Sequence, residues 1–167
     1  MFRSRIRSMN LIAIAILSLS ASSALSFNKD WYPKGPDARL TPGSYCNGNQ
    51  PSDRTGRPET CSRDVDSHLK WEVIGDYNKL GYDINSGNRM QFKIDHLVPL
   101  CFGGGNDKQN LWPQHQSIYV ITDKLEDIGC QKLRGGRISQ RKVITMLLEV
   151  KNDLSKADAM MNYLESL

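Results

Sequence analysis

The stretch "FKIDHLVPLCFGGGNDKQNLWPQH", residues 92–115, decides the fold and contains two of the three histidines in the 167-residue chain. Residues 91–100 have the branched, apolar composition of a β-strand. The glycine-rich segment 101–109 predicts a loop, and residues 110–114 predict a short second strand that Pro113 ends. The stretch therefore predicts a β-hairpin that encloses a glycine-rich loop.

Helices are expected before and after this hairpin, because apolar residues recur there at helical spacing. The pattern predicts helices over residues 67–80 and 116–133, and a last helix that Ser139 caps and that extends to Leu154. The predicted fold class is therefore α+β, with a small hairpin among several helices.

The first 26 residues have the three-part pattern of a secretory signal peptide. Three arginines precede the apolar core "LIAIAILSL", and small residues allow cleavage after Ala24 or Ser26. The core is well short of the about 20 apolar residues that span a bilayer, which argues against a membrane anchor. We expect removal of residues 1–26, which leaves an irregular arm over residues 27–64 and a domain over residues 65–167. No stable membrane association is expected after this removal.

The charge of the chain depends on this leader. The formal net charge falls from +4 to +1 on its removal, because three arginines and no acidic residue are lost. Affinity for nucleic acid must then come from a local basic cluster, although scattered basic residues are usually just solvated. The residues that could form a phosphate-binding rim around the hairpin are Arg89, Lys93, Lys108, Lys124, Lys132, Arg134, Arg137 and Arg141.

Four cysteines remain after the leader, namely Cys46, Cys61, Cys101 and Cys130. An even number in an exported protein favours two disulfides, and three pairings are open. A zinc site is disfavoured because the chain has no Cys-x-x-Cys pair. The leader and the cysteines together predict a secreted or periplasmic protein.

Asp95 and His96 are neighbours on the first expected strand, so their side chains should point to opposite faces and perform different tasks. A carboxylate is a hard oxygen ligand for Mg²⁺, whereas an imidazole suits proton abstraction near neutral pH. Asn110 follows His96 by fourteen residues and could fix the loop or the imidazole. Taken alone, His96 is more simply a hydrogen-bonded structural histidine. The glycines lack the Gly-Lys-Ser ending of a nucleotide-binding loop.

This order of strand, glycine loop, strand and helix resembles the HNH nucleases, which belong to the His-Me finger (ββα-metal) endonucleases. Residues 95–114 are similar to the pattern "DHLxPLxxGGxNDxxNLWPQ" of one secreted branch. The likeness continues outward and covers most of the chain after the leader. The outer matches, in the order of that branch, are "LTPG" at 40–43, Cys61, "TDKLE" at 122–126 and Cys130.

The resemblance implies a ββα-metal core and a metal-dependent endonuclease that hydrolyses phosphodiester bonds in DNA, with RNA as a further candidate substrate. It implies His96 as the general base that activates water and Asp95 as a ligand of one divalent cation, Mg²⁺ or Mn²⁺. It also implies Asn110 as the residue that holds the loop and orients the histidine. No recognition helix or zinc finger is evident, so little sequence specificity is expected. The sequence identifies no protein partner.

The second metal ligand departs from the family pattern. HNH proteins often place it nine residues after the matched asparagine, where this chain has Tyr119. His115 and Asp123 lie about one helical turn to either side, and either could substitute. Asp123 is preferred for its hard oxygen, and His115 could contact a phosphate instead. The departure leaves a second hypothesis, a secreted disulfide-stabilised binding module that keeps the HNH scaffold but lacks catalysis.

Overall fold

The computed structural model describes residues 30–167, so the predicted signal peptide lies outside the described residues. The helices and strands, in chain order, are α1 (Ser67–Lys79), β1 (Phe92–His96), β2 (Leu111–His115), α2 (Gln116–Arg134), α3 (Gln140–Asn152) and α4 (Ala157–Glu165). This mixture confirms the α+β class. Within residues 30–167, no helix combines the length and the apolar content needed to cross a bilayer.

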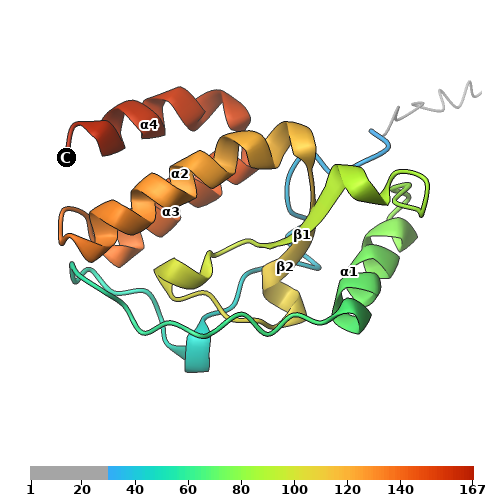
Figure 1. Cartoon of the computed structure of the whole chain (residues 1–167), viewed down its shortest axis with the longest axis horizontal. Helices are drawn as coiled ribbons and strands as arrows, with labels where there is room; N and C mark the ends of the chain where they lie inside the picture. Colours follow the sequence, from blue (N-terminus) through green and yellow to red (C-terminus); the bar gives the residue numbers. More distant parts are fainter. Residues whose placement is uncertain (1–29) are drawn as a thin grey trace, which may run out of the picture.

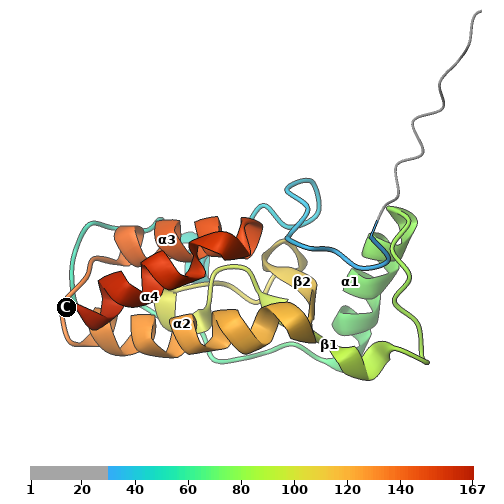
Figure 2. The ribbon, with the colours of Figure 1, turned by 90° about the horizontal axis from the view of Figure 1, so that it is seen from above.

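The hairpin lies in the middle of the molecule, with α1 on one side and α2, α3 and α4 on the other (Figure 1 and Figure 2). The apolar residues form two clusters that match this division. Trp112 of β2 is fully buried in the cluster with α1, and Phe102 of the loop is fully buried among α2, α3 and α4. The hairpin and its loop therefore contribute to both clusters and fix their relative placement.

The helix α1 begins and ends as its sequence predicts. The Asp66 carboxylate accepts a hydrogen bond from the Leu69 amide at 2.8 Å, which caps the first turn. Val73 and Tyr77 are buried toward the hairpin. Gly81 has a φ of 92°, a left-handed conformation that stops the helix without the strain a side chain would add.

The last predicted helix ends earlier than expected, at Asn152, so the prediction that it extends to Leu154 is wrong, and α4 beyond it was not predicted. The chain leaves the helical conformation at Asp153, which has φ −150° and ψ 95°. The Asp153 carboxylate accepts hydrogen bonds from the amide and the hydroxyl of Ser155. An aspartate that caps a following turn competes with helix continuation, and α4 starts afresh at Ala157.

The two strands pair antiparallel, with Pro113 opposite Ile94. The prediction that Pro113 ends the second strand is therefore wrong. The Leu97 amide donates to the Asn110 carbonyl at 2.7 Å, and the alternation of an antiparallel ladder then places the backbone groups of Pro113 on the edge away from β1. The missing N–H of proline removes no hydrogen bond from the hairpin there.

The outer edge of β1 is covered by cationic side chains rather than by another strand. Arg89 donates to the Phe92 carbonyl at 2.7 Å. Arg63, from the N-terminal arm, donates to the Ile94 carbonyl at 3.2 Å. These bonds satisfy carbonyl groups that would otherwise be free to pair with a second chain.

The triple-glycine stretch permits close approach of three backbone segments. A Cβ on Gly104 would lie 1.8 Å from the Val98 carbonyl oxygen, and one on Gly105 would lie 2.8 Å from the Ser44 hydroxyl. Ser44 belongs to the arm, and its carbonyl accepts the Gly105 amide at 3.0 Å. The glycines therefore serve packing of the loop against itself and against the arm.

We predict that Gly104→Ala lowers the free energy of unfolding by about 3 kcal/mol, because backbone must move to make room for the methyl group. Gly75 in α1 offers a matched control, since a Cβ there would meet no atom within 4 Å beyond its chain neighbours and the adjacent backbone of its own helix. Gly75→Ala should raise the free energy of unfolding by about 0.5–1 kcal/mol. Urea unfolding measures both, and equal stabilities of Gly104→Ala and the wild type would contradict the packing described.

The two predicted disulfides are confirmed, and the structure selects one of the three pairings. Cys46 pairs with Cys61 within the arm, and Cys101 pairs with Cys130. The second disulfide joins the loop after β1 to α2. It thereby fixes the loop that follows His96 against the helix that carries Asp123.

Candidate active site

A pocket of about 390 Å³ opens beside the end of β1. Asp95 and His96 of β1 and Glu126 of α2 lie on its wall, together with Arg63 from the arm and Arg134 at the end of α2. The structure therefore brings the predicted Asp-His pair into one cavity with two additional carboxylates, Glu126 and Asp127, and two cations.

The His96 imidazole is buried and is held by the loop rather than by β2. Its Nε2 lies 3.1 Å from Asn106 Oδ1. The Asn106 amide donates to the Ser62 carbonyl, and its oxygen accepts from the Asp64 amide. With Oδ1 as an acceptor, Nε2 carries the proton and Nδ1 is the nitrogen that can take another. Burial lowers the pKa of His96 below its usual value, which favours this neutral form.

Asn110 holds the loop, as expected, but does not bond to the imidazole. Its oxygen accepts from the Val98 amide at 2.9 Å, and its amide donates to the carbonyls of Val98 and Gly105 at 2.9 and 2.8 Å. The contact to the His96 ring comes from Asn106 instead. Asn110 can therefore orient His96 only through the shape of the loop.

Three carboxylates converge beside the pocket. Asp95, Asp123 and Glu126 each offer an oxygen that lies within 4.8 Å of the other two. Asp95 Oδ2 is buried and accepts no hydrogen bond from any described residue, although the Lys93 ammonium lies 3.2 Å away. Three hard oxygen donors fit a small divalent cation such as Mg²⁺, and two of the residues, Asp95 and Glu126, carry a buried oxygen that lacks a hydrogen bond. We refer to these three residues as the carboxylate cluster.

Lys93 is one of two ammonium groups that pair with this cluster; the other is Lys151 of α3, 3.9 Å from Asp95 Oδ2 and 2.7 Å from Glu126 Oε1. The Lys93 ammonium pairs with Asp95 and Asp123. Burial lowers the pKa of Lys93, but the two carboxylates outweigh this effect and the pKa lies above its usual value.

The Lys93 ammonium also lies 5.2 Å from the ring centre of Tyr119. Tyr119 occupies the sequence position at which the family pattern expects a second metal ligand. Tyr119 thus contacts the Lys93 ammonium through its ring.

The two candidates for the second ligand are placed differently. Asp123 belongs to the carboxylate cluster. His115 lies at the other end of the hairpin, opposite Phe92, and its ring stacks on Tyr32 with centroids 4.0 Å apart. His115 Nδ1 accepts from the Ser117 amide and caps α2. The structure therefore brings Asp123, but not His115, to Asp95.

The structure places the predicted phosphate-binding side chains in different surroundings. Arg89 donates to the backbone of β1, and Lys108 pairs with Asp76 of α1 at 2.8 Å. Lys93 faces the carboxylate cluster, and Lys124 is exposed on α2. The basic side chains that line the pocket are Arg63 and Arg134.

Sequence reasoning missed Glu126, Asn106 and Arg63. Glu126 had a usable signal, because it follows Asp123 by three residues and shares its helical face. Asn106 lies within the quoted motif, but its side chain could equally have faced solvent. Arg63 is 31 residues before Ile94 of β1. It reaches the pocket only because the arm folds back along the hairpin.

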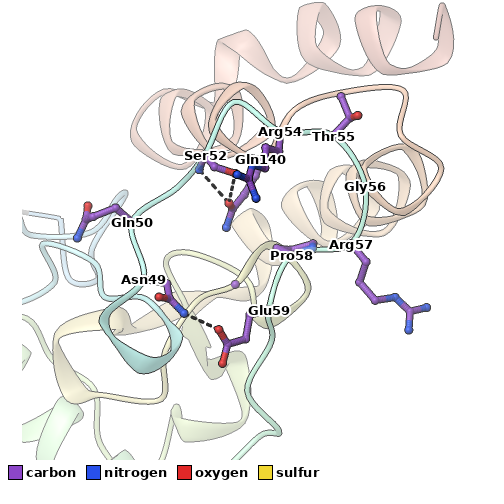
Figure 3. A pocket seen from close by; sticks show the side chains of 11 residues that line it. Asn49, Gln50, Ser52, Arg54, Thr55, Gly56, Arg57, Pro58, Glu59 and Gln140 are labelled. Atoms are coloured by element: carbon purple, nitrogen blue, oxygen red, sulfur yellow. Dashed lines mark hydrogen bonds between the residues drawn. The ribbon is translucent and has the colours of Figure 1, made fainter.

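A second pocket, of about 380 Å³, lies between the arm and the start of α3 (Figure 3). Gln140 accepts from the Ser52 amide at 2.9 Å, and Asn49 donates to Glu59 at 2.6 Å. The first bond holds the arm against α3, and the second joins two residues of the arm. None of the sequence-predicted site residues lines this pocket, so the pocket with His96 is the candidate active site.

Comparisons of the chain with models of protein families, with curated proteins and with solved structures find no match. The functional inference therefore depends on the sequence motif and on the geometry of the pocket with His96.

Proposed function

We propose that the protein is an exported, metal-dependent endonuclease of the HNH type, which cleaves DNA, and RNA as a further substrate, with little sequence specificity. The observation that carries the proposal is the shared pocket of His96 and Asp95, beside a cluster of three carboxylates. In this proposal β1, β2 and the start of α2 form the ββα-metal core.

The residues of the pocket would divide the chemistry of phosphodiester hydrolysis. His96 would accept the proton of the attacking water at Nδ1. Asp95, Asp123 and Glu126 would hold one Mg²⁺ or Mn²⁺, which when bound supplies positive charge for the phosphate and for the leaving oxygen. Arg63 and Arg134 would bind phosphate oxygens at the mouth of the pocket.

One observation favours the second hypothesis, a binding module without catalysis. The Lys93 ammonium already lies between Asp95 and Asp123, and a protein that never binds a cation would need such a counter-ion. In a nuclease, Lys93 must move aside when the cation binds. Its side chain is one-third exposed, so it has room to do so.

Removal of the metal separates these functions. Protein that lacks residues 1–26 should nick supercoiled plasmid in Mg²⁺ or Mn²⁺, and excess EDTA should stop the reaction, because the charge on the phosphate is then left without its cation. Renewed excess of the cation should restore it. Nicking that continues in EDTA would contradict the metal site. DNA binding in a gel-shift assay without nicking in any cation would support the binding module.

A further inference from the structure

Lys151 of α3 is buried completely, although lysine is seldom buried unless it is paired. Its ammonium donates to the His96 carbonyl at 2.6 Å and to the Leu97 carbonyl at 3.2 Å. It also lies 2.7 Å from Glu126 Oε1. One ammonium, with three N–H donors, therefore contacts the end of β1 and the carboxylate cluster together.

The burial of this charge needs an explanation. Removing an ammonium from water costs several kcal/mol even after relaxation, and an apolar side chain of similar length would avoid that cost. The neighbouring positions on the inner face of α3 are apolar, namely Val143, Leu147 and Val150. Packing of α3 alone would thus be satisfied by a methionine at position 151. The oxygens around the ammonium are the reason for a lysine.

The position on β1 is also distinctive. Arg89 and Arg63 bind the carbonyls of Phe92 and Ile94 on the same outer edge, but from the molecular surface. The next carbonyl on this edge is that of His96. Lys151 binds it from inside the protein. The residue that carries the imidazole is therefore the one whose carbonyl a fully buried cation binds.

We propose that Lys151 is a positioning residue, which fixes the backbone of His96 and the carboxylate of Glu126 at one point and so sets the distance between them. This inference rests on the proposed function. Lys151 does not line the pocket, so it acts through the groups that it holds. The Lys93–Asp123 pair is less confined than Lys151, because its side chains are 33% and 44% exposed whereas that of Lys151 is fully buried.

Steady-state cleavage of a labelled oligonucleotide tests the role. Lys151→Met should lower kcat by about a hundredfold, the effect of a misplacement of about 1 Å in reacting groups, and should leave KM unchanged. Lys156→Met is the matched control. Lys156 follows α3 closely in the chain, and the substitution removes only its exposed ion pair with Glu149. The control should retain the wild-type kcat. Equal kcat for folded Lys151→Met and the wild type would overturn the proposal.

The ring resonances of the histidines give a second readout that needs no activity. The chain has three histidines, at positions 68, 96 and 115. Lys151→Met should shift the ring carbon–proton resonances of His96 and leave those of His68 and His115 in place. Unchanged His96 resonances would overturn the proposal. If the wild type does not cleave DNA, the proposed function fails, while these resonances still report on the positioning role.

Lys151→Met leaves Glu126 without its cation and can prevent folding. Lys151→Arg keeps the charge and therefore supports the fold, but its planar guanidinium cannot reproduce the arrangement of three donors around one nitrogen. This variant should fold, shift the His96 resonances and fall between the wild type and Lys151→Met in kcat. A folded Lys151→Arg with wild-type kcat and unshifted His96 resonances would overturn the proposal.

Discussion

His96→Ala is expected to lower the rate of plasmid nicking by about 10²- to 10⁴-fold, because a positioned general base contributes that much to catalysis. The loss follows from the place of the imidazole in the pocket, where Asn106 holds Nε2 and leaves Nδ1 to accept a proton. The rate is measured by gel electrophoresis of supercoiled plasmid in Mg²⁺, with unfolding curves that establish that the variant is folded.

His68→Ala is the control for this experiment. The His68 side chain is 83% exposed on α1, and we expect its removal to leave the nicking rate unchanged. A folded His96→Ala variant that nicks plasmid at the wild-type rate would remove the imidazole from the mechanism. Equal losses in both variants would point to an indirect effect rather than to a base.

Asp95→Asn is expected to weaken cation binding and to lower cation-dependent nicking by about a thousandfold, since metal stabilisation of the transition state is worth several kcal/mol. The substitution keeps the size of the side chain and removes its charge. Asp95 is the most buried member of the carboxylate cluster, and its Oδ2 accepts no hydrogen bond from the described residues. This oxygen is therefore well placed to serve a cation.

Calorimetric titration with Mn²⁺ measures the binding part of this prediction separately from activity. Asp53→Asn is the matched control, because Asp53 of the arm is exposed and pairs with Arg141 of α3. It should bind Mn²⁺ as the wild type does. An Asp95→Asn variant with wild-type affinity for Mn²⁺ would place the cation elsewhere or exclude it from the cluster.

The hairpin and the helices α1, α2 and α3 could be predicted because their signals are local, whereas α4 was not predicted. Alternating or helical spacing of apolar residues, together with glycine and the caps, is read directly from neighbouring positions. The role of Pro113 could not be predicted in this way, since it depends on which edge of β2 its backbone faces. The break at Asp153 was missed because an apolar helical pattern continues through it.

In the candidate site, too, the residues with local signals could be predicted and those brought in by distant packing could not. Asp95, His96 and Asn110 lie within one motif, and Asp123 lies on the helix that follows it, so their proximity follows from short-range structure. Lys151 is separated from His96 by 55 residues, and only the packing of α3 against the hairpin brings them together. The pairing of the cysteines was open for the same reason, because an even number of cysteines does not determine which pairs meet.

The most direct test of the central claim is the initial rate of plasmid nicking by the wild type and by His96→Ala, each measured in Mg²⁺ or Mn²⁺ and in EDTA. We predict rapid nicking only for the wild type with a divalent cation, and rates lower by orders of magnitude in the other three conditions. Nicking by the wild type that is equal with cation and with EDTA, or equal to that of folded His96→Ala, would contradict a metal-dependent nuclease that uses His96.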